Sequence, residues 1–215
     1  MKIDRDEMLR YMGFRGQALS RENLEVFSRA EELCISAISP KTVVKEYEID
    51  HSTMQLAGTN VILQGQDIAR HLAGCKRVYL IAATLGLGLD KLVGRLMRED
   101  PVLGVAVDSA AVCAIESVLD DLCENLAEQC GKKLTSRFSC GYGDFPLEQQ
   151  PDFIRLLDMN RRLGVYLGAG NIMTPQKSVT AVVGICESSR DFGDNLKCGG
   201  KCAECALKDC AYRAK

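Results

Sequence analysis

The sequence predicts an α+β fold, in which a twisted, largely antiparallel sheet packs with helices and a cysteine-rich C-terminal tail follows. Helical and strand patterns mix without a regular βαβ repeat, which favours antiparallel over parallel strand pairing. The hydrophobic share of 47% in 215 residues is enough for a sizeable core. Apolar periodicity is lost near the C-terminus, where five of the 11 cysteines fall. We therefore expect one domain over residues 1–185, with residues 1–58 as its N-terminal helical and strand segment, and a metal-binding tail over residues 186–215.

Hydrophobic spacing predicts the elements of the first half of the chain. One helical stripe ends at Ser39 and Pro40, and a continuous apolar run over residues 78–83 is typical of a buried strand. The predicted elements, in order, are a helix over 21–38, strands over 42–49 and 60–63, a short helix over 65–75, a strand over 78–83 and a helix ending near residue 98.

A long helix dominates the second half of the chain. It is predicted over residues 102–130 and ends at Gly131, and its apolar face includes one acidic residue, Glu116. The elements predicted after it are a short strand over 133–138, a loop over 140–146, a helix over 153–162 and strands over 163–167 and 178–185.

The charge balance and the lack of long apolar runs argue against several classes of protein. Lys and Arg number 27 against 29 Asp and Glu, which argues against a broad surface for nucleic acid or anionic membrane. No apolar run reaches the roughly 18 residues of a membrane span, and residues 1–6 are too charged for a signal peptide. We expect a cytoplasmic protein whose cysteines are thiols or metal ligands rather than disulfides.

Two glycine-rich segments are candidate ligand loops. Gly86 and Gly88 follow a predicted strand, as in a dinucleotide-binding loop, but Lys91 stands where the third glycine belongs, which favours a simple turn into a helix. The second segment runs from Arg137 to Pro146. Its guanidinium offers a planar pair of donors for a carboxylate, and its glycines let a ligand approach the backbone closely. The alternative is a structural turn with an ion-paired arginine.

The second segment belongs to a series of motifs that resembles a known family. The motifs are Ala-Ala-Thr-Leu-Gly from Ala82, Arg-x-x-x-Gly-Tyr from Arg137, Arg-Arg-Leu-Gly-Val from Arg161 and Pro-x-Lys-Ser-Val-Thr-Ala from Pro175. Over residues 60–185 the chain resembles the activation domain of vitamin B12-dependent methionine synthase. It is most similar to the short stand-alone members of that family.

The resemblance implies a function and a set of ligand contacts. In that family the domain binds S-adenosylmethionine and docks over a cobalamin held by another module, so that Co(II) is reduced by one electron and methylated. Arg137 would hold the methionine carboxylate, and the backbone of Gly141, Tyr142 and Gly143 would contact the ligand. Glu116 would meet the cationic end of the ligand, or would instead pair with a neighbouring arginine. Because the sulfonium methyl group is already activated, we expect no catalytic residue in this chain itself.

Three positions depart from the family pattern. Cys140 stands where many relatives have proline before Gly-Tyr. Val182 and Val183 replace the aromatic pair of the long bacterial synthases, so the aromatic ligand contact of that strand is missing.

The tail carries a strong metal-binding pattern. Cys198, Cys202, Cys205 and Cys210 place four thiols close together beside two glycines, which suits Zn or an iron-sulfur cluster. Cys186 is a candidate fifth thiol or alternative ligand, and a flexible redox-active or simply reduced tail is the competing interpretation. The first three thiols also match the radical S-adenosylmethionine spacing, but that motif stands near the start of a large barrel, and this one stands at the end of the chain.

The resemblance implies a protein that supports reductive reactivation of a cobalamin-dependent methionine synthase lacking its own activation domain. S-adenosylmethionine would be its ligand, cobalamin would be held by the partner, and a flavodoxin- or ferredoxin-type protein would donate the electron. Two alternatives stay open. One is an electron-transfer or reactivation partner of another corrinoid methyltransferase, acting through an iron-sulfur cluster in the tail; the other is a non-catalytic binding module stabilised by metal.

Overall fold

Helices and strands mix along the chain without a βαβ repeat, which confirms the predicted α+β class. The computed structural model describes residues 2–14 and 17–186. The helices are α1 (Arg5–Tyr11), α2 (Arg21–Ala37), α3 (Gln66–His71), α4 (Leu87–Glu99), α5 (Pro101–Cys130), α6 (Gln150–Leu157) and α7 (Met159–Leu163), with short 3-10 turns η1 (Leu147–Gln149) and η2 (Ala169–Asn171). The strands are β1 (Lys41–Asp50), β2 (Gln55–Leu56), β3 (Cys75–Thr84), β4 (Tyr166–Leu167), β5 (Met173–Thr174) and β6 (Ser178–Cys186).

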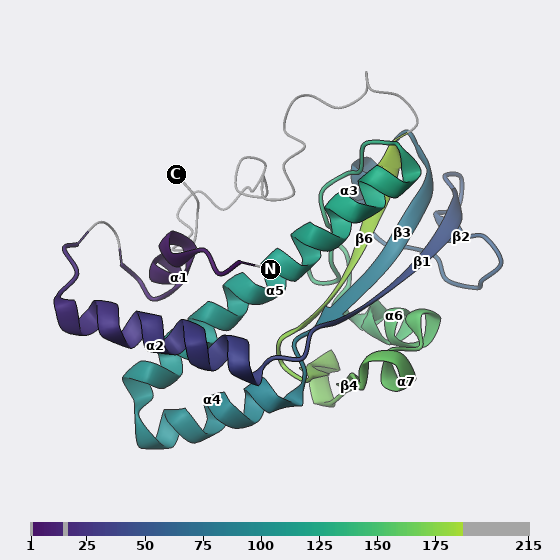
Figure 1. Ribbon diagram of the computed structural model, residues 1–215. Helices are drawn as coiled ribbons and strands as arrows, with labels where there is room; N and C mark the ends of the chain where they lie inside the picture. The colour runs from purple at the N-terminus through teal and green to yellow at the C-terminus, as the bar shows by residue number, and fades with distance from the viewer. Residues whose placement is uncertain (1, 15–16, 187–215) are drawn as a thin grey trace.

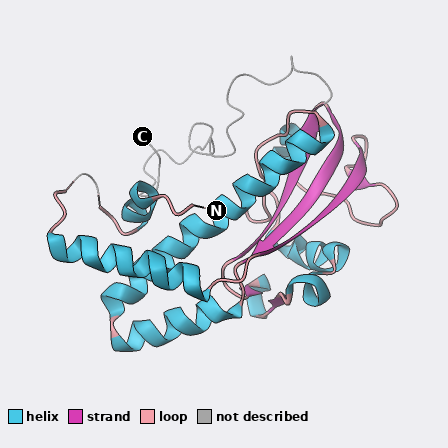
Figure 2. Ribbon diagram, viewed as in Figure 1, coloured by secondary structure: helices cyan, strands magenta, loops and turns pink. Residues whose placement is uncertain are grey.

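A four-stranded antiparallel sheet organises the molecule, as predicted. Its strand order is β2-β1-β3-β6, and each neighbouring pair is antiparallel. α5 lies across one face of this sheet together with α1, α2 and α4, whereas α6 and α7 cover the other face (Figure 1). Figure 2 shows the same separation of the strands from the helical layers on either side.

β3 is the central strand of the sheet, with β1 on one side and β6 on the other. Its Ile81 pairs with Val44 of β1 and with Ala181 of β6. Because successive side chains of a strand point to opposite faces, Leu80 and Ile81 are both fully buried but lie in different cores. The continuous apolar run that predicts this strand therefore reflects burial on both faces.

Each face of the sheet carries its own hydrophobic core. The α5-side core joins β3 and β6 to α2, α4 and α5, and α1 closes it through the buried Met8. The α6-side core joins the opposite face to α3, α6 and α7, and it includes Phe145 and Phe153, whose ring centroids are 6.1 Å apart. Burying one such large apolar side chain contributes roughly 1.5 to 3 kcal/mol, so both helical layers are firmly held to the sheet.

α5 owes its length to well-capped ends and a largely apolar middle. Asp100 accepts a hydrogen bond from the Leu103 N–H at 3.2 Å, and Pro101 occupies the first turn. Gly131 ends the helix in the left-handed conformation with φ of 62°, as expected from the sequence. By length and hydropathy this helix is able to cross a membrane, but 61% of its most apolar window is buried inside the protein. Its apolar residues are therefore those of a core helix.

The strand predicted over residues 60–63 is wrong. The short β2 lies earlier in the chain, and Ile62 makes one isolated bridge, to Gln55. A run of three apolar residues is too short to distinguish a strand from an extended loop. The Val61 carbonyl accepts from the Leu56 N–H of β2 at 3.0 Å, whereas the Ile62 carbonyl and the Gln64 N–H bind the side chain of Gln149.

The helix predicted over residues 153–162 is two helices, α6 and α7. Asp158 separates them in the left-handed conformation, with φ of 52°. The strand predicted over residues 163–167 shrinks to β4, because Leu163 completes α7. The helical face of this region is continued across the break, since Leu157 and Leu163 both lie in the α6-side core.

Candidate functional site

The segment after α5 returns along the outer edge of β6 and carries Arg137. Phe138 exchanges two backbone hydrogen bonds with Val182, at 3.0 and 2.8 Å, and Leu134 makes a second bridge to the same strand. The continuous strand predicted over residues 133–138 is therefore reduced to two isolated bridges. Phe138 packs against the α6-side core, whereas Arg137 reaches the side chains of α5.

Arg137 is a buried guanidinium held by two carboxylates of α5. Its side chain is 2% exposed, its Nη1 lies 2.6 Å from Asp120 Oδ1 and its Nη2 lies 2.5 Å from Glu116 Oε2. The two acids are one helical turn apart, and their side chains are 40% and 47% exposed for Glu116 and Asp120 respectively. Of the two alternatives for Glu116, pairing with an arginine is present in this structure. Ligand contact by either Arg137 or Glu116 stays a prediction.

The glycine loop after Arg137 is anchored at its base and exposed at its tip. The Gly141 N–H donates to the Phe145 carbonyl at 2.8 Å, and the Phe145 N–H donates to the Tyr142 carbonyl at 2.9 Å. Gly141 and Gly143 have φ of 90° and 54°, a region that favours glycine. Phe145 is 1% exposed, whereas Tyr142 is 47% exposed. An exposed aromatic ring on an anchored loop is a suitable platform for a flat ligand.

The positions that depart from the family pattern offer no substitute chemistry. Burial raises the pKa of the Cys140 thiol to about 12, so this thiol is protonated at neutral pH and is a poor nucleophile. Val183 is fully buried in the α5-side core, and Val182 is fully buried in the α6-side core. Both valine side chains therefore belong to the hydrophobic cores of the sheet.

Both histidines bind backbone carbonyl groups. His51 Nε2 lies 2.6 Å from the Cys75 oxygen, and His71 Nε2 lies 2.8 Å from the Ser136 oxygen. The second contact fastens α3 to the residue before Arg137. Both rings thus have a structural role.

Three acidic residues of this region are not among the ligand residues that the sequence predicts. The position of Asp120 could be predicted from the sequence, because it stands four residues after Glu116 and so lies on the same helix face. Asp67 and Asp144 contact each other across a separation of 77 residues. The sequence does not predict that pair, because periodicity relates only residues within one helix or strand, and these two residues lie in separate segments.

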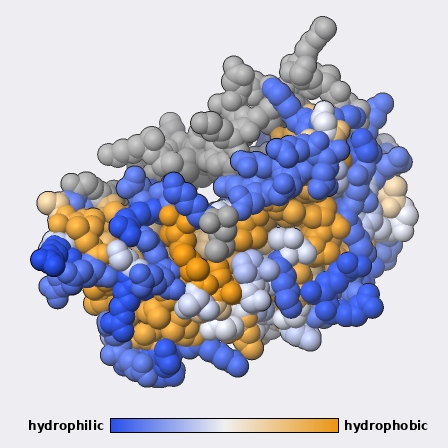
Figure 3. All heavy atoms as spheres, viewed as in Figure 1, coloured by the Kyte–Doolittle hydropathy of each residue, from blue (hydrophilic) through white to orange (hydrophobic). Residues whose placement is uncertain are grey.

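A separate hollow of about 360 Å³ lies between α4, α5 and the turn before β6. Its lining residues are Leu89, Asp90, Val93, Gly94, Met97, Asp108, Gln176 and Lys177. Lys177 Nζ lies 2.8 Å from Asp108 Oδ1. Figure 3 shows apolar side chains on the helical part of the surface. Val102 and Val105 of α5 are exposed. None of the predicted ligand residues lines this hollow.

Within residues 2–14 and 17–186, no group of three His, Cys, Asp or Glu side chains is placed to hold a metal ion. The predicted metal ligands Cys198, Cys202, Cys205 and Cys210 lie outside the described residues. Cys186, the alternative ligand, is buried at the end of β6. Metal binding by the tail stays a prediction.

Comparison with known proteins supports the fold class. The chain is similar to a crystal structure of the MetH reactivation domain bound to AdoHcy, with a TM-score of 0.59 and 15% sequence identity. The match covers 85% of this chain and 74% of that chain. No family model matches the sequence, and no curated protein matches it. At this identity the likeness shows a shared fold alone.

Proposed function

We propose that this chain is a stand-alone activation protein that binds S-adenosylmethionine and supports reductive reactivation of a cobalamin-dependent methionine synthase in the cytoplasm. One observation carries the proposal: the Arg137 to Tyr142 motif stands at the edge of a sheet whose fold is similar to a reactivation domain bound to AdoHcy. In the reaction, cobalamin on the synthase would supply the nucleophile and S-adenosylmethionine the activated methyl group. The part of this chain would be to bind and orient its ligand.

The charges of the site suit such a ligand. One guanidinium and two carboxylates leave a net negative charge on the α5 surface, which favours a sulfonium and an ammonium group. Arg137 would bind the ligand carboxylate. Because its guanidinium is buried and already paired, we expect ligand binding to move Glu116 or Asp120 away from it. The exposed ring of Tyr142 would stack on the adenine.

Titration with AdoHcy is expected to give saturable binding at one site. Calorimetry is the appropriate measurement, because the chain has no tryptophan to report binding by fluorescence. Methionine alone and adenosine alone serve as controls, since each carries half of the recognised groups and should bind much more weakly. Absence of any heat signal with both AdoHcy and S-adenosylmethionine would contradict the proposed ligand.

The partner is tested by reconstitution with a synthase that lacks an activation domain and has been inactivated in its Co(II) form. Synthase activity is expected to return when this protein, S-adenosylmethionine and a flavodoxin- or ferredoxin-type donor are all present, and not when any one is omitted. Recovery of synthase activity without this protein would contradict the reactivation role. It would not contradict the proposed binding of S-adenosylmethionine, which calorimetry tests separately.

We also propose that the tail binds a metal, because the spacing of its four cysteines suits Zn or an iron-sulfur cluster. Anaerobically purified protein is expected to contain metal that is lost when Cys202 and Cys205 are both replaced by serine. Cys130→Ser, which alters a half-buried thiol of the folded domain, is the matched control. Zinc without iron or sulfide would contradict an electron-relay role, and metal-free protein would contradict metal binding.

A further inference from the structure

The glycine loop and the start of α3 hold each other by reciprocal hydrogen bonds. Asp144 Oδ2 accepts from the Gln66 N–H at 2.7 Å, and Asp144 Oδ1 accepts from the Asp67 N–H at 2.9 Å. In return, Asp67 Oδ2 accepts from the Asp144 N–H at 3.2 Å. The N–H groups of Asp67 and Gln66 also hold the pKa of Asp144 below its ordinary value. We call this set of three hydrogen bonds the aspartate clamp.

Two glycines make this close approach possible. A Cβ atom at Gly65 would lie 2.6 Å from Asp144 Oδ1 and 2.9 Å from the Asp144 carbonyl oxygen. A Cβ atom at Gly143 would overlap the Asp67 carboxylate. Gly65 and Gly143 have φ of 117° and 54°, which are also unfavourable for other residues. The clamp thus depends on backbone shape as well as on the two carboxylates.

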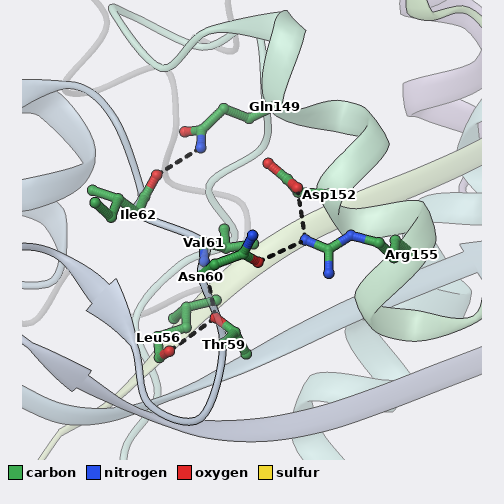
Figure 4. Close-up of polar contacts among 8 residues, drawn as sticks. All are labelled: Leu56, Thr59, Asn60, Val61, Ile62, Gln149, Asp152 and Arg155. Carbon is green, nitrogen blue, oxygen red and sulfur yellow. Dashed lines mark hydrogen bonds and ion pairs between the residues drawn. The ribbon is translucent and has the colours of Figure 1, made fainter.

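A second fastening joins the same two segments further along. The Gln149 Nε2 donates to the Ile62 carbonyl at 2.7 Å, and the Gln149 Oε1 accepts from the Gln64 N–H at 2.7 Å. Figure 4 shows the Gln149 side chain reaching Ile62 and the Arg155 guanidinium lying between Asp152 and Asn60. Gln149 is 5% exposed, so its two hydrogen bonds are shielded from water.

The aspartate clamp restrains the exposed part of the glycine loop, which the hydrophobic core does not hold. Phe145 fixes the base of the loop in the α6-side core, but Gly141, Tyr142 and Gly143 are all exposed. Exposed glycines have wide conformational freedom, and ordering them when a ligand binds would cost affinity. Asp144 directly follows these residues, so a fixed Asp144 limits the conformations open to them.

We propose that Asp67 and Asp144 are positioning residues, which hold the Gly141–Gly143 backbone and Tyr142 ready for ligand through the aspartate clamp. This inference rests on the proposed function, since it concerns the same ligand site. Neither carboxylate is assigned a ligand contact. Arg70 pairs with Asp67 on the exposed surface of α3, and its charge stabilises the carboxylate in the clamp.

The decisive variant is Gly65→Ala, which pushes Asp144 out of the clamp without changing any charge. Gly74→Ala is the matched control, because Gly74 also has a positive φ, of 83°, but has open space where the Cβ would be placed. The two measurements are the AdoHcy dissociation constant by calorimetry, taken well below the unfolding temperature of each variant, and hydrogen exchange of residues 139–147. Gly65→Ala is expected to weaken binding roughly tenfold and to speed exchange in this segment, whereas Gly74→Ala should change neither. Asp144→Asn should behave like Gly65→Ala, since one of the two accepting oxygens becomes an NH2 group, which donates and cannot bind an N–H group.

The outcomes separate this inference from the proposed function. Failure of the wild-type protein to bind AdoHcy would overturn the proposed function, and with it a positioning role at that site. Wild-type binding with unchanged affinity in both Gly65→Ala and Asp144→Asn would overturn the positioning role alone. Faster exchange without a loss of affinity would have the same meaning, because the clamp would then serve the fold and not the ligand.

Discussion

Replacing Arg137 by alanine is expected to lower the free energy of unfolding by about 2 to 3 kcal/mol and to abolish AdoHcy binding. The substitution removes a side chain that is 2% exposed and leaves Glu116 and Asp120 without their shared counter-charge. Breaking a fully buried ion pair costs roughly 3 to 5 kcal/mol, but these two carboxylates are half exposed, and water compensates part of the loss. Urea unfolding and calorimetric titration of the same preparation measure the two effects.

The matched variants separate charge from geometry at Arg137. Arg137→Lys keeps the positive charge but cannot reach both acids with a planar fork, so we expect an intermediate loss of stability and a large loss of affinity. The double variant Glu116→Gln, Asp120→Asn keeps the hydrogen-bonding shape and tests whether the negative charge attracts the ligand. An Arg137→Ala protein that unfolds at the same urea concentration as the wild type would contradict the structural part of this prediction.

Burial of Arg137 is a feature that sequence patterns do not predict. The motif Arg-x-x-x-Gly-Tyr identifies a guanidinium beside a ligand loop, but the partners of that guanidinium come from α5, 17 and 21 residues earlier in the chain. Their arrangement depends on how the segment after α5 crosses β6. Glu116 was expected on an apolar helix face, and the acid one turn later completes the pair that holds Arg137.

The elements with strong periodicity are predicted well, and the exceptions have local causes. The apolar run of β3 reflects burial in the two cores on either side of the sheet, and the long stripe of α5 faces the α5-side core, so both patterns are clear in the sequence. The break between α6 and α7 falls at Asp158, a residue without the marks of a helix end such as Gly or Pro. The aspartate clamp is missed for another reason, since its partners are brought together by the packing of α3 beside the glycine loop.

Phe145→Ala is expected to destabilise the protein by about 3 to 4 kcal/mol and to weaken AdoHcy binding. The Phe145 ring is 1% exposed, and its centroid lies 6.1 Å from those of Phe138 and Phe153, so truncation leaves a cavity at the base of the glycine loop. Its backbone also makes the two hydrogen bonds that curl the loop, and these would no longer be held by a buried side chain. The free energy of unfolding from urea titration and the AdoHcy dissociation constant are the measurements.

Tyr142→Ala is the matched control for this aromatic loop, because it removes a ring that is 47% exposed and leaves the core intact. Its expected cost in stability is below about 1 kcal/mol, whereas its expected loss of affinity is large, since the exposed ring is the one assigned to the ligand. Phe145→Leu, which retains most of the buried volume, should recover at least half of the stability lost in Phe145→Ala. If Phe145→Ala and Tyr142→Ala proved equally stable, the loop would not be anchored through its buried phenylalanine. The two aromatic residues thus have different roles, because the buried ring of Phe145 fixes the backbone of the loop and the exposed ring of Tyr142 is available to the ligand.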